Sequence, residues 1–108
     1  MKRGDIWLIE LPFREGKEQR GVRPGIILAD STAGMIVTIP ITSHQEALRF
    51  PHTIKIKKSS VNNLDKDSVV LLFQIQSLDK KRFIHKLGDL EGEMMDHIDA
   101  HLKEFLHL

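Results

Sequence analysis

The sequence predicts one mainly β domain, a small and strongly curved antiparallel sheet or barrel closed by a single C-terminal helix. Short runs rich in β-branched and aromatic residues recur between turn-forming residues over the first four fifths of the chain. Apolar residues at helical spacing follow only near the end. The chain contains no repeat, linker or low-complexity tract, so we expect residues 1–108 to form a single domain. Strands that all precede one helix are typical of this architecture.

The first two strands are predicted over residues 3–11 and 23–30. Residues 12–22 begin with a proline and hold two glycines and many charges, which indicates a long, mobile connection. Pro24 fixes its own φ and favours extended backbone at the residue before it. We therefore expect Arg23 to stand where this connection becomes a strand, a position from which a cation can hold an anion.

The third and fourth strands are predicted over residues 35–41 and 53–57, with a loop at 42–52 between them. Apolar and polar residues alternate cleanly in the fourth, which indicates a half-buried strand. Pro40 cannot donate a hydrogen bond to a neighbouring strand. We therefore expect the third strand to lie at an edge of the sheet, or to bulge at Pro40.

Two more strands and the helix complete the predicted fold. Residues 68–76 are the most apolar run and are expected at the centre of the sheet, and residues 79–87 indicate a last short strand. The helix is expected to follow Asp89, which can cap it. Its apolar stripe consists of Leu90, Met94, Ile98, Leu102 and Phe105 or Leu106.

Composition excludes several classes of protein. The chain has no cysteine, which removes disulfides, thiolate zinc sites and a cysteine nucleophile, and fits a cytoplasmic protein. No apolar run is long enough for a membrane span, and the first residues lack the apolar segment of a signal peptide. Residues 1–88 hold 15 Lys and Arg against 9 Asp and Glu, whereas residues 89–108 hold 1 against 6. A basic body with an acidic tail indicates a polyanion or an acidic peptide as partner.

Neither a metal site nor a cofactor site is predicted. His97 and His101 share a helix face, but the residues between them lack the glutamate of the metalloprotease motif, and no third ligand is evident. The chain has no glycine-rich phosphate loop, so we expect no nucleotide cofactor. His44 lies in the loop after the third strand, where a histidine can act as a base but is more often only solvated.

The remaining candidates for chemistry are polar and cationic. Arg23 opens one strand, Thr42 ends another, and Gln74 and Gln76 are expected on one face of a third. Further cations surround them in the sequence, namely Lys17, Arg20, Arg49 and residues 80–82. In a small curved sheet these strand ends can meet. Such a set can hold a phosphodiester, with a cation stabilising the charge that develops when phosphorus becomes five-coordinate.

The chain resembles the MazF/PemK family of toxins from type II toxin–antitoxin systems. The matching pieces are residues 3–7 (Arg-Gly-Asp-Ile-Trp), Gly16, 18–19 (Glu-Gln), 22–24 (Val-Arg-Pro), 39–42 (Ile-Pro-Ile-Thr), 51–52 (Pro-His), 67–69 (Asp-Ser-Val), 74–75 (Gln-Ile), 78–80 (Leu-Asp-Lys), 86–90 (Lys-Leu-Gly-Asp-Leu) and 93–96 (Glu-Met-Met-Asp). Each piece is unspecific, but their number, order and spacing cover nearly the whole chain.

The resemblance implies a fold, an activity and partners. The fold is an SH3-like curved β-barrel with a C-terminal helix, assembled as a homodimer. The activity is a metal-independent, sequence-specific endoribonuclease that cleaves single-stranded RNA by attack of the RNA's own 2′-OH, leaving a 2′,3′-cyclic phosphate and a 5′-OH. The partner is an antitoxin (MazE-like) whose flexible acidic C-terminal segment blocks the RNA groove. No cofactor is expected.

By position, Arg23 corresponds to the catalytic arginine of the family and Thr42 to its threonine partner. The RNA-binding residues implied by the resemblance are Lys17, Glu18, Gln19, Arg20, Ser43, His44, Arg49, Gln74 and Gln76. Specificity for the cut site is expected to depend on loops 14–22 and 43–52. Many relatives carry a basic residue in place of Gln76, and an apolar one in place of Gly25. Gly25 either loosens the start of the strand or lets the backbone approach RNA closely.

Two other functions stay open at this stage. CcdB-like toxins share the fold but bind DNA gyrase, and they rely on a tryptophan in the C-terminal helix, whereas the only tryptophan here is Trp7. The other alternative is a non-catalytic RNA-binding module with the same barrel.

Overall fold

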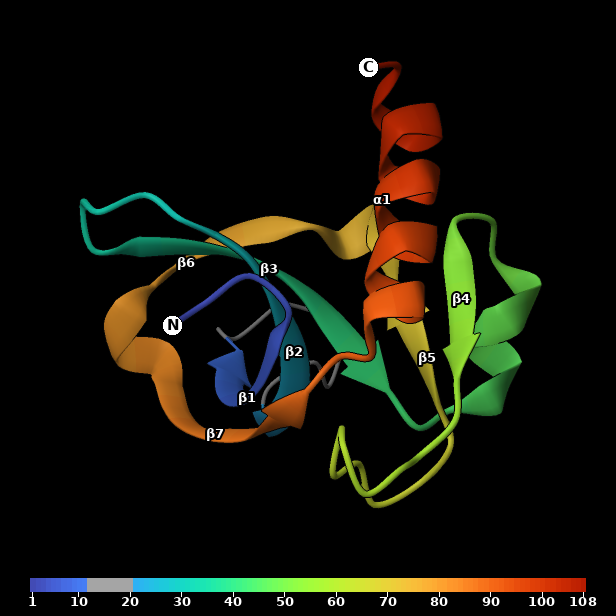
Figure 1. The fold of residues 1–108 in the computed structure, drawn as a ribbon, viewed down its shortest axis with the longest axis horizontal. Helices are drawn as coiled ribbons and strands as arrows, with labels where there is room; N and C mark the ends of the chain where they lie inside the picture. The colour runs from blue at the N-terminus through green and yellow to red at the C-terminus, as the bar shows by residue number, and fades with distance from the viewer. Residues whose placement is uncertain (12–20) are drawn as a thin grey trace.

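Antiparallel strands and one C-terminal helix make up the fold in the computed structural model, which describes residues 1–11 and 21–108 (Figure 1). The strands are β1 (Asp5–Leu11), β2 (Gly21–Asp30), β3 (Met35–Thr42), β4 (Thr53–Ile56), β5 (Ser68–Leu71), β6 (Gln76–Asp79) and β7 (Phe83–Asp89), and the helix is α1 (Gly92–Leu106). Three short 3₁₀ turns join strands: η1 (Gln45–Arg49), η2 (Leu72–Gln74) and η3 (Lys80–Arg82). The predicted class, mainly β with a C-terminal helix, is confirmed.

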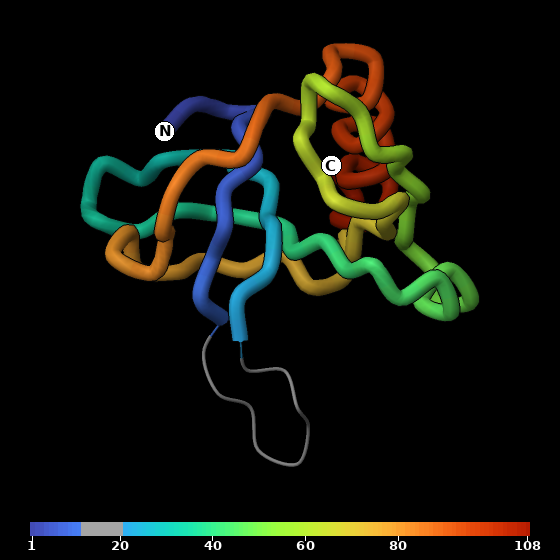
Figure 2. Tube along the Cα trace, turned by 90° about the horizontal axis from the view of Figure 1, so that it is seen from below, coloured from blue at the N-terminus to red at the C-terminus, as the bar shows by residue number. Residues whose placement is uncertain are grey.

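The sheet is strongly curved around a small apolar core. Its strands lie in the order β4-β5-β3-β2-β1-β7, and β6 also pairs with β3 (Figure 2). Side chains from five strands meet in one buried cluster, made of Ile9, Leu11, Ile27, Ile36, Leu78 and Phe83. Within the described residues no ladder joins β6 to β7, which are connected through η3. Backbone pairing therefore leaves the curved sheet open at this place.

A larger core lies between the sheet and α1. The helix buries Ile98 and Leu102 against Ile54, Val70 and Leu72, and further residues of β1, β2 and β3 join the same cluster. In Figure 1 α1 accordingly stands beside β4 and β5. Apolar burial at about 25 cal/mol per Å² makes this contact the main reason for the helix to dock. No helix in the described part of the chain is long and apolar enough to cross a membrane.

Pro40 neither places β3 at an edge nor coincides with a bulge in its pairing with β2, so this prediction is wrong. β3 pairs with β2 along one side and with both β6 and β5 along the other. On that second side the partner changes from Gln76, opposite Thr38, to Val70, opposite Ile41. Pro40 falls between the two ladders, where a missing N–H costs no hydrogen bond.

The predicted single strand 68–76 is also wrong, because η2 interrupts it. If the pairing of Val70 with Ile41 continued without a break, Thr38 would face Phe73, but it faces Gln76. The three residues of η2 form this insertion. Leu72, fully buried in the core, directs the turn inwards, and Phe73 is left outside. An apolar run in the sequence predicts that its residues are buried, but it does not predict where a turn interrupts the strand.

Two boundaries near the end of the chain differ from expectation. The last strand begins at Phe83, after η3, instead of at 79. Asp89 does not cap the helix, because it is still paired in β7 and its carboxylate binds Lys86 at 2.8 Å. The N-cap is Glu91, in extended conformation and without a side-chain cap hydrogen bond.

Gly25 lies where a side chain would force its neighbours to move, an explanation that differs from both interpretations made from the sequence. It is buried in β2, opposite Pro40 of β3. A Cβ at this position would lie 2.2 Å from Cδ1 of Ile9 and 2.9 Å from Oγ1 of Thr38. Only a residue without a side chain lets those two neighbours approach β2 as closely as they do.

A buried carboxylate fixes the start of β1. Asp5 is 5% exposed, accepts the N–H of Lys2 at 2.8 Å, and pairs with Lys86, which also binds Asp89. Burial alone would raise the pKa of Asp5, but the hydrogen bond from Lys2 and the Lys86 ammonium outweigh it, so the pKa lies below its ordinary value. The pair ties β1 to β7 and thereby holds the strand that lies beside Arg23.

Candidate functional site

Arg23 stands on a ridge between two depressions, each about 400 Å³ in volume. It lies near the start of β2, opposite Ile9 of β1, and is half-buried. The first, which we call the aromatic depression, includes Arg23, Thr42, His44, Phe50, Phe73 and Gln74. The second, which we call the strap depression, includes Arg23, Ser43, Asn63, Asp65, Lys66 and Leu87. The sequence placed Arg23 at a strand start, and the structure adds that two different surfaces meet there.

Arg23 and Thr42 are brought together as expected. Nη1 of Arg23 donates to Oγ1 of Thr42 at 3.3 Å. The same oxygen accepts the backbone N–H of His44 at 3.3 Å. Thr42 is buried at the end of β3, opposite Val69, so its hydroxyl has a fixed position. A hydroxyl has one proton and two lone pairs. Both contacts use the lone pairs, so within the described residues the proton of Thr42 is left to donate to a ligand.

His44 lies beside this pair in the aromatic depression. Its Nδ1 is 3.3 Å from Oε1 of Glu46, and both side chains are exposed. The pKa of Glu46 lies below its ordinary value, first because its own backbone N–H bonds the carboxylate and second because His44 does. An ionised Glu46 can therefore accept a hydrogen bond from Nδ1 of His44.

The two glutamines are not equivalent. Gln74 lines the aromatic depression. Gln76 lies in β6 opposite Thr38, lines neither depression, and donates from Nε2 to the carbonyl of Gln74 at 3.2 Å. Both were predicted on one face of a single strand. In the structure Gln74 lies in η2 and Gln76 in β6, so the two do not belong to one strand. Gln76 supports the backbone at Gln74, and its contact with RNA stays a prediction.

Two aromatic residues of the site were missed from the sequence. Phe50 follows η1 and Phe73 lies in η2, and their ring centroids are 6.0 Å apart at an interplanar angle of 59°. Arg49, which was expected to bind RNA, has its guanidinium carbon 5.0 Å from the centre of the Phe50 ring. No signal for Phe73 was available in the sequence, because the run 68–76 predicts one uninterrupted strand and the η2 turn appears only in the pairing with β3.

The strap depression is walled by residues 57–67, which we call the strap. Its centre is Asn62, which is fully buried. Oδ1 of Asn62 accepts the N–H groups of Ser59 and Leu64 at 2.9 and 3.0 Å, and Nδ2 donates to the carbonyl of Lys57 at 2.9 Å. Where the strap crosses β7, a Cβ on Gly88 would lie 2.5 Å from the carbonyl oxygen of Val61. The strap is thus bonded into one shape and packed against β7.

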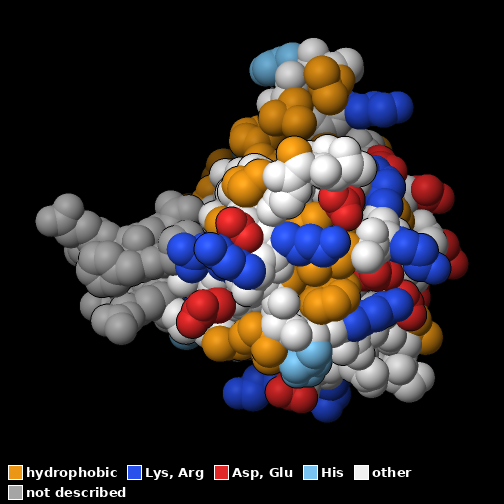
Figure 3. All heavy atoms as spheres, turned by 90° about the vertical axis from the view of Figure 1, so that its left-hand side faces the viewer, with side chains coloured by type: hydrophobic (Ala, Val, Ile, Leu, Met, Phe, Trp, Pro, Cys, Tyr) orange, Lys and Arg blue, Asp and Glu red, His pale blue; other side chains and the backbone are white. Residues whose placement is uncertain are grey.

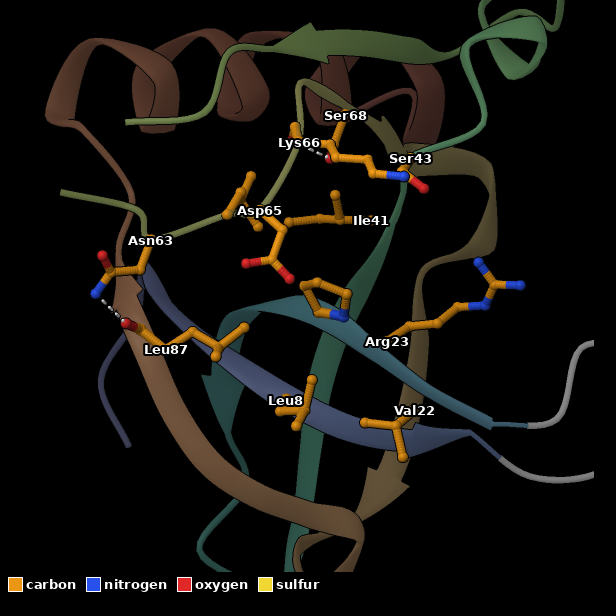
Figure 4. Close-up of a pocket in the computed structure, with 12 residues that line it drawn as sticks. Leu8, Val22, Arg23, Ile41, Ser43, Asn63, Asp65, Lys66, Ser68 and Leu87 are labelled. Carbon is orange, nitrogen blue, oxygen red and sulfur yellow. Dashed lines mark hydrogen bonds between the residues drawn. The ribbon is translucent and has the colours of Figure 1, made fainter. Parts of the chain in front are cut away.

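Charged side chains line the strap depression without forming ion pairs among the described residues (Figure 4). The Asp65 carboxylate faces the open middle, and the Lys66 side chain extends towards Ser43. Nδ2 of Asn63 donates to the carbonyl of Leu87 at 2.8 Å. The Arg23 stem lies along this depression, whereas its guanidinium points away from it. The head group that can hold an anion is therefore on the aromatic side.

Four of the expected RNA-binding residues, Lys17, Glu18, Gln19 and Arg20, lie outside the described residues. In the described part of the chain no three His, Asp or Glu side chains gather in a group that could hold a metal ion. His97 and His101 pack edge to face, with ring centroids 4.9 Å apart.

The face shown in Figure 3, on the side of β6 and η3, carries basic and acidic side chains mixed with apolar ones. This face has no single block of positive charge.

Comparison with known proteins gives one family and one fold. The sequence profile described as "PemK-like, MazF-like toxin of type II toxin-antitoxin system" matches residues 2–106. The chain is 37% identical over 103 residues to "Endoribonuclease MazF" of Staphylococcus saprophyticus subsp. saprophyticus, covering 92% of this chain and 85% of that protein.

Solved structures show the same fold. The chain is similar to MazF from Deinococcus radiodurans with a TM-score of 0.79 at 21% identity, covering 100% of this chain and 97% of that one. It is also similar to an endoribonuclease in complex with its cognate antitoxin from a mycobacterial species, with a TM-score of 0.73 at 18% identity, covering 98% and 94%.

Proposed function

Because the chain belongs to the family of PemK-like, MazF-like toxins of type II toxin–antitoxin systems, we propose that it is an endoribonuclease that cleaves single-stranded RNA at short sequence motifs. The observation that carries this proposal is the Arg23–Thr42 pair. A permanent cation and a hydroxyl with a free proton meet at the edge of an open depression. Both groups can donate to the same phosphate.

The proposed reaction is attack by the 2′-OH of RNA on the adjacent phosphorus. The new P–O2′ bond forms, the P–O5′ bond breaks, and the products are a 2′,3′-cyclic phosphate and a 5′-OH. Negative charge grows on the non-bridging oxygens, and preorganised donors at such oxygens are the strongest single catalytic contribution. Arg23 supplies a planar fork for two oxygens, and Thr42 supplies one further hydrogen bond.

Proton transfer requires a group other than this pair. An arginine side chain does not lose its proton in a protein, and both lone pairs of Thr42 are occupied. His44 lines the same depression with its Nδ1 beside Glu46, so we propose that it takes the proton of the attacking 2′-OH, while solvent supplies the proton that the leaving 5′ oxygen gains. This mechanism uses no metal ion.

We also propose a homodimer and an acidic inhibitory partner. Large apolar side chains stay exposed on one chain, among them Val22 at 50% and Ile84 at 51%. A second copy can cover part of this surface. One structural relative is an endoribonuclease with its cognate antitoxin, and a flexible acidic segment of such a protein would bind near Arg23. Such an enzyme acts where mRNA is, so we expect it in the cytoplasm.

The test is cleavage of a long single-stranded RNA by the purified protein in excess EDTA. We expect discrete fragments with cyclic phosphate and 5′-OH ends, and we expect Arg23→Ala to cut on the order of 10²–10³ times more slowly. Arg23 is half-buried at a strand start, so the variant should keep its circular dichroism spectrum and its elution volume.

Three outcomes would contradict the proposal. A folded Arg23→Ala variant that cuts at the wild-type rate would remove Arg23 from the site. Cleavage by wild type only after divalent metal is added would exclude the metal-free mechanism. Light scattering that gives the 12.4 kDa monomer at micromolar concentration would exclude the homodimer.

A further inference from the structure

Two phenylalanine rings are exposed where burial would be expected. Phe50 is 46% exposed and Phe73 is 38% exposed, whereas Phe83 is 7% exposed in the core. The two rings are 6.0 Å apart and tilted by 59°, within the range in which aromatic pairs attract each other. They form a small exposed apolar surface, and exposing it to water does not stabilise the monomer.

Hydrogen bonds to backbone groups fix the turns that carry the two rings. Phe50 donates its N–H to the carbonyl of Ala47 at 3.0 Å, and its own carbonyl accepts the hydroxyl of Thr53 at 2.9 Å. Phe73 follows Leu72, whose N–H bonds the carbonyl of His52 at 3.0 Å. The turns carrying the two rings are thus tied together, so the pair is built before any ligand arrives.

The pair shares the aromatic depression with the donors for a phosphate. Arg23 and Thr42 line the same space, and the Arg49 guanidinium lies over Phe50. Cations next to exposed aromatic rings are what single-stranded nucleic acid requires, because the cations hold the backbone and each base stacks on a ring. We propose that Phe50 and Phe73 are the stacking platform for one base next to the scissile phosphate. The inference rests on the proposed ribonuclease activity and names two new substrate-binding residues for it.

Stacking should contribute to binding without reading the base identity, since every base has a π-face. The platform therefore explains affinity and position of the strand, while the choice of cut site is made elsewhere. Replacing both rings by alanine should weaken RNA binding about 5- to 150-fold, the range that corresponds to one stacked base.

The experiment measures binding separately from cleavage. A dye-labelled 2′-O-methyl oligoadenylate cannot react, because its 2′ oxygen is blocked, and its Kd follows from fluorescence anisotropy. A matched strand without bases carries the same phosphates. We expect the Phe50→Ala/Phe73→Ala variant to bind the oligoadenylate more weakly than wild type, and to bind the abasic strand as wild type does.

Matched variants distinguish stacking from a structural role. Phe73→Trp should keep the affinity, because it keeps a π-face, and Phe73→Leu should lose it although it stays apolar. The slope of log Kd against log salt should not change with the rings, because they contact no phosphate. Leu106→Ala, at a similarly exposed apolar residue at the end of α1 that lines neither depression, should leave all values unchanged.

If the Phe50→Ala/Phe73→Ala variant lost as much affinity for the abasic strand as for the oligoadenylate, the stacking platform would be overturned, because the rings would then only support the phosphate site. Wild-type affinity in Phe73→Leu would also overturn it, since a plain apolar contact, such as one for a peptide side chain, would suffice. Both results are distinct from failure of the proposed function, which appears as wild-type protein that cuts no RNA.

Discussion

The aromatic depression and the strap depression share Arg23 but differ in how they are built. The first is walled by 3₁₀ turns that present two exposed rings. The second is walled by the strap, whose shape depends on the buried amide of Asn62 and whose rim carries Asp65 and Lys66. One side therefore offers exposed apolar surface, and the other offers charges on a rigid backbone.

The difference assigns the two ends of the Arg23 side chain to different tasks. Its stem lies along the strap depression, and its guanidinium bonds Thr42 on the aromatic side. An RNA strand that crosses the ridge with its scissile phosphate at the guanidinium leaves neighbouring nucleotides in both depressions. In the proposed function, chemistry would therefore take place on the aromatic side, and the strap side would contribute to binding alone.

The largest effect should come from Arg23→Lys, which keeps the charge and the stem but loses the planar fork. We expect kcat to fall on the order of 10²–10³-fold, because a point charge does not hold two phosphate oxygens in the transition state. The Kd for the 2′-O-methyl oligoadenylate should change little, because the cation remains. Single-turnover kinetics measure the first value and anisotropy the second.

Arg23→Ala is the matched control, since it loses the stem, the charge and the fork. It should weaken binding as well as rate. If Arg23→Lys cleaves within about tenfold of wild type, the fork is not needed and the assignment of chemistry to the aromatic side fails.

The next largest effect should come from Thr42→Ala. The proposed hydrogen bond from Thr42 to a charged phosphate oxygen is worth about 1.5–3 kcal/mol, so the rate should fall roughly 10- to 150-fold. Thr42→Ser keeps the hydroxyl and should retain most of the rate. Activity of Thr42→Ala equal to that of Thr42→Ser would show that the hydroxyl contacts no reacting atom.

The sequence predicted the pair at the centre of this comparison but not the surfaces around it. Arg23 and Thr42 were found because prolines and apolar runs mark where strands start and end. Phe73 was missed because η2 is an insertion against β3, and an apolar run of constant character contains no sign of it. The prediction for Pro40 was wrong for the same reason. The ladders of β3 with β6 and with β5, which flank Pro40, come from tertiary pairing that the sequence does not show.

The strap shows the opposite limit. Residues 58–67 are polar in sequence and predict only a loop, yet Asn62 is fully buried. Its partners are local, but its burial depends on β7 and the glycine at 88, far along the chain. Single-sequence patterns report local conformation, and they do not report which distant strand covers a loop.

A smaller effect, on stability, should come from Asn62→Ala. It leaves the N–H groups of Ser59 and Leu64 without their acceptor, at about 1–3 kcal/mol for a buried group without a partner. The melting temperature should fall by several degrees, as thermal denaturation can measure. Below the transition the variant should keep single-turnover cleavage within a few-fold of wild type, because the aromatic side is intact.

Ser60→Ala is the control for the strap, because Ser60 is exposed and its side chain makes no hydrogen bond within the described residues. Its melting temperature should match that of wild type. A loss of cleavage in folded Asn62→Ala as large as in Thr42→Ala would mean that the strap contributes to chemistry.

The smallest effect should come from the exposed charges of the strap depression, and its sign is the informative part. If this side carries a phosphate next to the scissile one, Lys66→Ala should weaken binding a few-fold and reduce the slope of log Kd against log salt by about 0.7. Asp65→Asn should strengthen binding slightly, because a negative charge facing the same space is removed. Lys103→Ala changes an exposed cation on α1, outside both depressions, and should leave the slope unchanged. Equal slopes in Lys66→Ala and wild type would show that RNA leaves Arg23 only over the aromatic side, and the two depressions would then serve different ligands.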